Sequence, residues 1–496
     1  MPEQYDLIIR DGTVYDGSGA PGIDADVGVR GDVIAAVGDL GDATGGEEIA
    51  AAGHAVVPGF IDVHSHDDNL VLVEPDVTGK TMQGVTTVVV GNCGSGVVPY
   101  QRARDGLMRA LDVPEDFPTW SSYPEYLDVI DAHPPSLNVA TLVGHGTLRS
   151  GAMGGPGERR PPSADELTRM RAWLAEGLEA GAVGVSTGLI YEPGRYTETE
   201  ELIEMARECA RIGGLYASHI RGEGGTLLDA VSEAIRIGEE AGCPVEISHH
   251  KATGEANWGR VKDSLALIEQ ARSRGLDVTA DQYPYIASST GLAAIALNAR
   301  ESGAGLRGET IFIASAPRTP EHEGKYLSAI ADELDLPLED AIDRLLGDNS
   351  RTVTIVAFGM DEADVRTVLR HESTMIGTDG LGWGSRPHPR HFGTYPRILA
   401  HYVREEGVLT LEEAIHKMTG MPAQKFRLTD RGHVREGFAA DLVVFDPSAI
   451  VDNATYEDPR NAPTAMPHVF VNGAAVVRDG EHTHARVGRA LRRGGS

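Results

Sequence analysis

Short apolar runs recur along the middle of the chain and alternate with stretches that have helical periodicity. Two of these stretches are 227–241 and 261–274. Because buried parallel strands read as continuous apolar runs, and alternating β and α units build parallel sheets, the pattern predicts an α/β fold of the (β/α)8, TIM-like barrel type. The eight runs are 61–64, 86–90, 138–143, 183–186, 215–219, 245–248, 278–282 and 375–378.

The interval between the seventh and eighth runs is much longer than the other connections. It spans about ninety residues, far beyond the ordinary length of a loop in a compact domain. We therefore expect a helical subdomain at about 290–365, inserted into a barrel that occupies residues 58–420.

Both ends of the chain are made of short strands and turns. Asp11-Gly12 and Arg30-Gly31-Asp32 each separate two apolar runs, which predicts two hairpins. Similar runs occur near the C-terminus at 441–445, 469–471 and 475–477. We expect residues 1–57 and 421–496 to build one small sheet domain together.

Composition narrows the possible partners and compartments. A net charge of −30 disfavours binding to nucleic acid or to an anionic membrane surface. No apolar run approaches the ~18 residues that cross a bilayer, and the first residues do not resemble a secretory signal. The three cysteines, an odd number at scattered positions, argue against a disulfide framework. We expect a cytoplasmic protein that acts on a small molecule, and the oligomeric state stays open.

Two histidines directly follow the first apolar run, in Gly59-Phe60-Ile61-Asp62-Val63-His64-Ser65-His66-Asp67-Asp68. Side chains two positions apart on a strand project to the same face, so His64 and His66 can bind one ion together. Imidazole is the commonest protein ligand for zinc and related metals. The alternative for this motif alone is a pair of histidines on a half-exposed strand.

The residues at the other strand ends decide between a metal site and a pair of half-exposed histidines. In (β/α)8 barrels the active site lies at the C-terminal ends of the strands, where this chain places several histidines, one cysteine and one carboxylate. This convergence favours a metal site. His145 can be functional or structural, and His250 alternates away from His249 and is expected to be structural. The polar residues at these ends are His64, His66, Cys93, His145, His219, His249 and Asp379.

The ordered motifs resemble the amidohydrolase superfamily, and within it the N-acyl-D-amino-acid deacylases, or D-aminoacylases. The similarity covers essentially the whole chain. It includes the terminal segment Gly437-Phe438-Ala439-Ala440-Asp441, which in amidohydrolases belongs to a β-sandwich built by both chain ends. The motifs are Gly-Phe-Ile-Asp-x-His-x-His-Asp-Asp, Gly-Asn-Cys-Gly, Ser-Thr-Gly-Leu-x-Tyr, Ser-His-His-Lys, Asp-x-Tyr-Pro-Tyr, and Asp-Gly followed by His-Pro-Arg.

The resemblance implies a zinc-dependent hydrolysis of N-acyl-D-amino acids to a carboxylate and a free D-amino acid. It implies that Cys93, His219 and His249 hold a tightly bound zinc ion, and that His64 and His66 form a second, weaker site that Cys93 can bridge. Asp379 would be the catalytic acid and base. The implied substrate contacts are Tyr191, Lys251, Tyr283, Ser288 and Arg390, with Arg390 the partner for a carboxylate and Arg221 adding local positive charge.

Two other functions are weighed against this one. A hydantoinase or dihydroorotase would share the fold but would usually carry a metal-bridging lysine at the end of strand four, and residues 182–190 contain no lysine. A non-catalytic scaffold with this fold would be expected to have lost its metal ligands at the strand ends. The preference for the D form rests on the resemblance alone, and the side-chain preference stays open.

Overall fold

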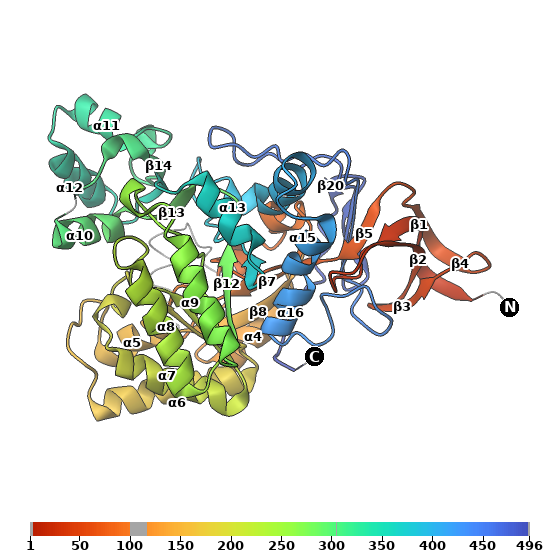
Figure 1. Cartoon of the computed structure of the whole chain (residues 1–496), viewed down its shortest axis with the longest axis horizontal. Helices are drawn as coiled ribbons and strands as arrows, with labels where there is room; N and C mark the ends of the chain where they lie inside the picture. Colours follow the sequence, from red (N-terminus) through yellow and green to blue (C-terminus); the bar gives the residue numbers. More distant parts are fainter. Residues whose placement is uncertain (1–2, 100–116, 304, 495–496) are drawn as a thin grey trace.

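A parallel eight-stranded sheet curls into a barrel at the centre of the molecule (Figure 1). The computed structural model describes residues 3–99, 117–303 and 305–494. All eight apolar runs form barrel strands, which confirms the predicted fold class. The strands are β6 (Phe60–Asp62), β7 (Val85–Val90), β8 (Asn138–Gly144), β9 (Gly184–Gly188), β10 (Leu215–His219), β11 (Val245–Ile247), β12 (Val278–Gln282) and β16 (Thr374–Ile376).

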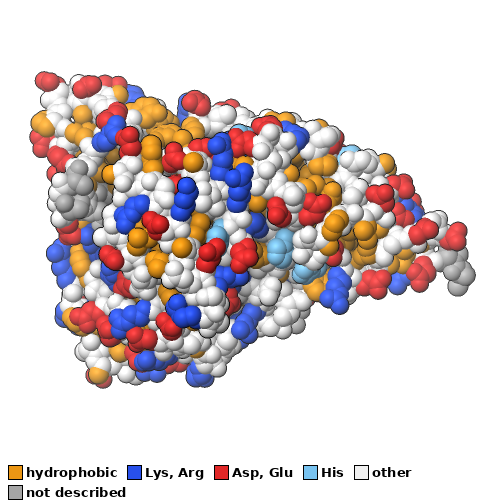
Figure 2. All heavy atoms as spheres, in the orientation of Figure 1, with side chains coloured by type: hydrophobic (Ala, Val, Ile, Leu, Met, Phe, Trp, Pro, Cys, Tyr) orange, Lys and Arg blue, Asp and Glu red, His pale blue; other side chains and the backbone are white. Residues whose placement is uncertain are grey.

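Helices cover the outside of the barrel. The helix α6 begins with the capping box of Ser163 and Glu166 and ends at Gly181, whose left-handed backbone terminates it. Acidic and basic side chains are interspersed over the outer helices (Figure 2), and pairs such as Arg171–Glu208 join neighbouring helices. These helices are α4 (Tyr123–Ala132), α5 (His145–Met153), α6 (Ala164–Ala180), α7 (Thr199–Ile212), α8 (Leu227–Ala241), α9 (Val261–Ser273), α13 (Glu362–Arg370) and α15 (Leu411–Met418).

The barrel closes between its first and last strands through a buried polar cluster. The segments that follow β6 and β16 are joined by an isolated bridge between Ser65 and Gly380. Asp62 accepts hydrogen bonds from the backbone and hydroxyl of Thr378 at 2.8 and 2.7 Å, and from Lys80 Nζ at 2.7 Å. Lys80 is fully buried. Because His64 and Asp379 follow these two strands directly, the cluster sets the distance between them.

The opposite, N-terminal end of the barrel is closed by apolar residues. Helix α16 (Gly420–Lys425) and the turn after it place Ala423, Phe426 and Leu428 against the interior side chains of the strands. Lys425 bonds Asp277, the residue before β12, at 2.8 Å, which locates α16 at this end. We call this part of the molecule the barrel floor.

The two chain ends form a separate sheet domain at one side of the barrel (Figure 1). β5 and β17 pair antiparallel and so join the N-terminal and C-terminal strands. The division of the chain at residues 57 and 421 stays a prediction. The strands are β1 (Gln4–Val14), β2 (Ile23–Arg30), β3 (Val33–Gly38), β4 (Thr44–Ala50), β5 (Ala55–Pro58), β17 (Leu442–Phe445), β18 (His468–Val471), β19 (Ala474–Arg478) and β20 (Glu481–His482).

One of the two predicted N-terminal hairpins is wrong. Asp11-Gly12 lies inside the continuous strand β1, where the pairing with β2 shifts register between Ile9 and Gly12. Asp11 has a φ of 58°, and β1 pairs with β2 both before and after Asp11-Gly12. The two residues therefore form a β-bulge. The hairpin at Arg30-Gly31-Asp32 is present, between β2 and β3.

The insertion between the seventh and eighth strands lies on the other side of the barrel from the sheet domain (Figure 1). Besides the expected helices α10 (Leu292–Ser302), α11 (Leu327–Leu334) and α12 (Leu338–Asp348), it contains an antiparallel sheet that the sequence pattern did not predict. That sheet consists of β13 (Ala287–Gly291), β14 (Ile311–Ser315) and β15 (Thr354–Phe358). β13 consists mainly of serine, threonine and alanine, so it does not form the apolar run by which the other strands were predicted. Across the described ranges, no helix has both the length and the hydropathy for a membrane span.

Candidate metal centre

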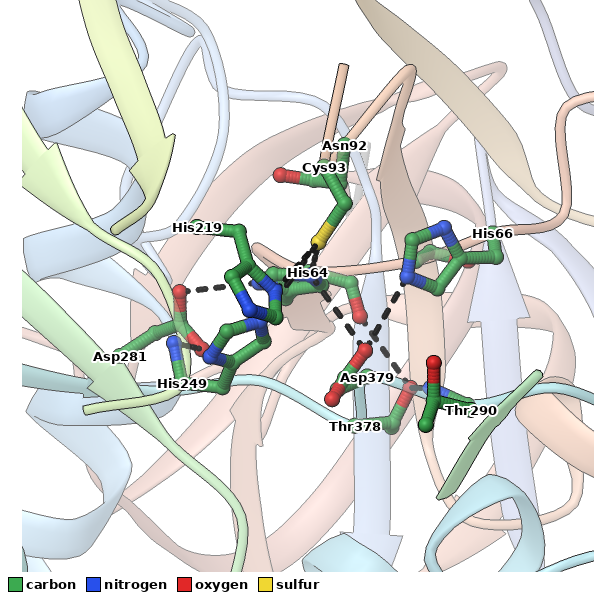
Figure 3. A network of polar contacts seen from close by, with 12 residues as sticks. His64, His66, Asn92, Cys93, His219, His249, Asp281, Thr290, Thr378 and Asp379 are labelled. Carbon is green, nitrogen blue, oxygen red and sulfur yellow. Dashed lines mark hydrogen bonds and ion pairs between the residues drawn. The ribbon is translucent and has the colours of Figure 1, made fainter. Parts of the chain in front are cut away.

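Cys93 lies at the centre of a buried cluster of imidazoles at the C-terminal end of the barrel (Figure 3). Its Sγ is 3.4 Å from His64 Nε2, 3.6 Å from His219 Nδ1 and 3.5 Å from His249 Nε2. These residues come from the ends of strands one, two, five and six. The structure thus brings together the thiol and the histidines that the sequence placed on separate strands.

The distances suit a shared metal ion. Sulfur and nitrogen bound to one tetrahedral zinc ion, at about 2.3 and 2.05 Å from it, stand about 3.5 Å apart. His64, Cys93, His249 and Asp379 each offer one ligand atom, and these atoms all lie within 4.8 Å of one another. His219 approaches the thiol through Nδ1 and belongs to a second group of possible ligands, with Glu223 and His249. The donor set of thiolate, imidazole and carboxylate is the one that zinc prefers.

The surroundings favour the thiolate form of Cys93. Burial opposes ionisation, but the charge of His64 and hydrogen bonds from His219 and His249 outweigh it, so the pKa of the thiol lies well below its ordinary value. Only the thiolate binds metals well. The cluster therefore supplies the ligand state that a metal ion requires.

Asp379 lies beside this cluster, at the end of strand eight. Its Oδ1 is 3.4 Å from His64 Nε2 and 3.1 Å from His66 Nε2, and its Oδ2 is 2.9 Å from Arg390 Nη1. Burial would raise its pKa, but Arg390, His64 and His249 hold it well below the usual range. The carboxylate is therefore ionised and able to accept a proton.

His64 and His66 do not lie within a regular strand, because β6 ends at Asp62. The alternation argument for the pair therefore does not apply, although the rings remain neighbours with centroids 5.4 Å apart. His66 contacts Asp379 and is absent from the four-donor group that contains His64.

Three residues of the centre have left-handed backbones that residues other than glycine seldom adopt. The φ angles of Cys93, His249 and Asp379 are 53°, 38° and 47°. Such conformations cost about 1–3 kcal/mol each and persist where the surrounding structure enforces them. Here they turn each side chain off its strand and toward the common centre.

Two carboxylates that were given no role from the sequence orient the histidines. Asp281 Oδ2 is 3.1 Å from His64 Nδ1, and its Oδ1 accepts the backbone N–H of His249 at 2.9 Å. Glu223 Oε1 is 3.1 Å from His249 Nδ1. A carboxylate on the distal nitrogen leaves the other nitrogen free for a metal. The sequence offered one signal for each of these carboxylates. Asp281 belongs to the Asp-x-Tyr-Pro-Tyr motif, and Glu223 follows His219 by four residues.

The predicted substrate residues surround the centre in two layers. Tyr283 is buried between Arg390, 4.4 Å above its ring centre, and Lys251 Nζ at 5.7 Å. Lys251 already bonds Glu223 at 2.6 Å and lies 2.8 Å from His249 Nδ1. Arg390 is fully buried, and its Nε has no hydrogen-bond partner among the described residues. Arg390 is ion-paired with Asp379 and donates to the backbone oxygen of Ser289, and it is not among the residues that line the two cavities beside the centre.

Two cavities meet at Asp379. The small cavity, of about 340 Å³, is lined by His66, Cys93 and strand-end glycines. The large cavity, of about 1180 Å³, extends between the barrel and the insertion, and Lys251 and Ser288 line it. Tyr191 lines both cavities, and its hydroxyl lies 2.9 Å from Thr290 Oγ1, at the boundary between them.

Three further residues considered from the sequence lie outside the metal cluster. His145 bonds Glu201 at 2.9 Å, at the start of α5, and His250 bonds Ser264 of α9 at 2.8 Å. Arg221 lines the large cavity but is paired with Glu233 at 2.9 Å.

Known proteins are similar to this chain in both sequence and fold. A sequence model of the amidohydrolase family matches residues 47–299 and 266–477. D-aminoacylase of Alcaligenes xylosoxydans xylosoxydans is 42% identical over 493 residues, which are 99% of this chain and 98% of that protein. The crystal structure of N-acyl-D-glutamate deacylase from Bordetella bronchiseptica, complexed with zinc and a phosphonate mimic of the tetrahedral intermediate, has a TM-score of 0.90 and 41% identity over 99% of this chain and 100% of that chain.

A D-aminoacylase structure described for its binuclear metal centre has a TM-score of 0.89 and 43% identity, over 99% of this chain and all of that one. The family model covers most of the sequence, and the identities exceed 40% over nearly the full length. The resemblance that the motifs indicated is confirmed. The chain belongs to the amidohydrolase family.

Proposed function

We propose that this protein is a zinc-dependent deacylase that hydrolyses N-acyl-D-amino acids to a carboxylate and a free D-amino acid. One observation carries the proposal: Cys93 Sγ stands 3.4–3.6 Å from three imidazole nitrogens, with the ionised Asp379 beside them. Full-length relatives with the names D-aminoacylase and N-acyl-D-glutamate deacylase support the reaction and the D form of the substrate.

Cys93, His219 and His249 would hold the tightly bound zinc ion. His64 and His66 would hold a second, weaker one, to which Cys93 could also contribute. When bound, zinc would polarise the amide carbonyl and lower the pKa of a water molecule toward about 7. Asp281 and Glu223 keep the distal nitrogens of His64 and His249 engaged, so that their other nitrogens face the centre.

Asp379 is the proposed general base and acid. Its low pKa keeps it ionised at neutral pH, so it can take a proton from the attacking water. It then returns this proton to the leaving nitrogen, because an amide anion is far too basic to leave unprotonated. The neighbouring Arg390 stabilises the carboxylate form between these steps.

Arg390 is also the proposed partner of the substrate's α-carboxylate. Its planar guanidinium can bind a carboxylate through two parallel hydrogen bonds, and its buried Nε is still without an acceptor among the described residues. Tyr191 and Ser288 line the path to the centre and are proposed to contact the substrate. Tyr283 and Lys251, which are both buried beside the metal centre, are also proposed to contact the substrate.

A cyclic-amide hydrolase is the alternative with the same fold. Its usual metal-bridging lysine is missing from residues 182–190, and both lysines near the centre have other partners: Lys80 bonds Asp62, and Lys251 bonds Glu223. A non-catalytic scaffold is the other alternative, and the strained, convergent ligand set argues against it.

The test is turnover of N-acetyl-D-methionine, N-acetyl-L-methionine, hydantoin and dihydroorotate by the protein after loading with zinc. We expect hydrolysis of the D-methionine derivative alone. Preferred hydrolysis of a cyclic amide would reject the proposal. So would a metal-loaded protein that is inert toward all four compounds and also toward N-acetyl-D-glutamate. Bound zinc, measured in the same preparation, separates a missing metal from a wrong substrate.

A small-molecule substrate and a cytoplasmic location complete the proposal. All three cysteines are free and buried, which fits a reducing compartment.

A further inference from the structure

The large cavity exceeds what the reacting atoms need. Its volume of about 1180 Å³ is several times that of the small cavity at about 340 Å³, although both reach Asp379. Most of it lies away from the metal centre, between the barrel mouth and the insertion. The chemistry of its walls therefore bears on which substrates reach the centre.

The sheet of the insertion forms one wall of this cavity, with apolar lining residues on β14 and β15 and hydroxyl-bearing ones on β13. Ala357 of β15 pairs directly with Ser288 of β13 and with Ile311 of β14, and all three line the cavity. Directly paired residues on antiparallel strands share a face, so this face of the sheet is turned toward the cavity. Further apolar lining comes from Ile190, Ile286, Ile295, Phe358 and Met360.

The cations of the cavity are already neutralised. Among the described lining residues, Arg195 pairs with Glu301, Arg221 with Glu233, Lys251 with Glu223 and Arg307 with Glu309. Two more carboxylates, Glu255 and Asp379, line the same cavity. A second carboxylate on the substrate would enter a space that offers it no unpaired cation from these residues and places two acidic groups in its path.

We infer that the large cavity holds the amino-acid side chain and selects bulky apolar D-amino acids over D-glutamate and D-aspartate, while the small cavity holds the acyl group. The inference rests on the proposed function. Ser288 and Lys251, two of the proposed substrate contacts, line only the large cavity. Arg390 is the proposed partner of the α-carboxylate and is itself paired with Asp379, so a side-chain carboxylate would need another cation.

The size of the small cavity agrees with this assignment. Its walls include Gly94, Gly146 and Gly188, and a Cβ on Gly188 would stand 2.2 Å from the backbone oxygen of Cys93. Backbone atoms therefore form part of the wall of this cavity, where no side chain can move aside to widen it. A short acyl group fits such a space.

The first experiment measures kcat/KM of the zinc-loaded protein for the N-acetyl derivatives of D-alanine, D-leucine, D-tryptophan and D-glutamate. We expect D-leucine and D-tryptophan to exceed D-glutamate by about tenfold or more, since the side-chain carboxylate of D-glutamate would lose water without gaining an unpaired cation. D-glutamate turned over as well as D-leucine would overturn the inference. No turnover of any of the four would instead count against the proposed function itself.

The substitution Ala357→Phe tests which cavity holds the side chain. The new ring would project into the large cavity, so we expect the ratio of kcat/KM for the D-tryptophan and D-alanine derivatives to fall by about tenfold. The same variant is assayed with N-acetyl-, N-butyryl- and N-hexanoyl-D-alanine. An effect that grows with acyl length and spares the D-tryptophan ratio would show that the two cavities are assigned the wrong way round.

The substitution Glu233→Gln tests the role of charge. It removes the partner of Arg221, which lines the cavity, and we expect kcat/KM for the D-glutamate derivative relative to D-leucine to rise about two- to fivefold. Glu240→Gln on the same helix is the matched control, because its partner Arg236 lies on the outer surface. An unchanged ratio in Glu233→Gln, or an equal rise in both variants, would overturn the charge argument.

Discussion

The two ends of the barrel differ in nearly every property. The C-terminal end carries a thiol, imidazoles and a carboxylate within hydrogen-bonding distance of their neighbours, and three of these residues have backbones with positive φ. The floor at the N-terminal end is filled by Ala423, Phe426 and Leu428 against aliphatic strand residues. The same eight strands thus serve two purposes, because function tolerates strain and polarity at one end while the packed other end provides the stability to hold them.

Cys93→Ala should have the largest effect, because it removes the atom that contacts all three histidines. We expect zinc content to drop well below that of the parent protein and deacylation to become undetectable. The melting temperature of the metal-free form should change little. Full zinc occupancy in this variant, measured by elemental analysis, would show that the thiol is no ligand.

Asp379→Asn separates chemistry from metal binding at the same end. An amide cannot take up the proton of the attacking water, and loss of a general acid–base group costs about 10²- to 10⁴-fold in rate. We expect zinc content close to that of the parent and kcat reduced by that factor. Near-normal kcat would remove Asp379 from the proposed role.

Phe426→Ala tests the floor. The ring is buried, and truncating such a side chain costs about 3–5 kcal/mol of unfolding free energy. We expect a lower midpoint in urea denaturation but unchanged kcat and KM at temperatures where the variant is folded. A selective loss of activity in the folded variant would break the comparison, since it would tie the floor to the chemistry.

Glu246→Gln should have the smallest effect. Glu246 is a buried carboxyl beside Thr279 of the neighbouring strand, and burial together with the charge of Asp281 raises its pKa well above the ordinary value. A group whose pKa is raised on folding contributes full stability below its unfolded pKa, and that contribution is lost as pH rises toward the folded pKa.

The glutamine variant cannot ionise, so it should gain stability relative to the parent as the pH rises above about 4.5. Unfolding curves at pH 4 and pH 8 measure this, with equal stability expected near pH 4. A difference that is the same at both pH values would contradict a titrating Glu246.

Much of the fold could be read from local patterns. The eight barrel strands were found because fully buried strands are uninterrupted apolar runs, and α8 was placed at 227–241 by its periodicity. Predictions were wrong where a short sequence motif is compatible with two different local structures. Asp11-Gly12 fits a hairpin or a bulge, and only pairing with β2 on both sides selected the bulge. β13, rich in serine and threonine, is a strand because β15 lies beside it.

The candidate site divides in the same way. Cys93, His219, His249 and Asp379 could be selected from sequence because a barrel brings all its strand ends to one rim. Glu223 and Asp281 escaped because an acidic residue near a strand end is common, and nothing local shows which imidazole it faces. Lys251 was expected to contact the substrate, but its bond to Glu223 and its contact with His249 emerged only in three dimensions.

By itself, the sequence determined the barrel, the family and the residue types available at its mouth, because periodicity and strand-end chemistry are local properties of the chain. The tertiary structure alone decided how those residues meet: the 3.4–3.6 Å spacing around Cys93, the pairing of every described cavity cation with a carboxylate, and the separation of two cavities at Tyr191 and Thr290. These are distances between side chains far apart in the chain, and only packing of the whole molecule sets them.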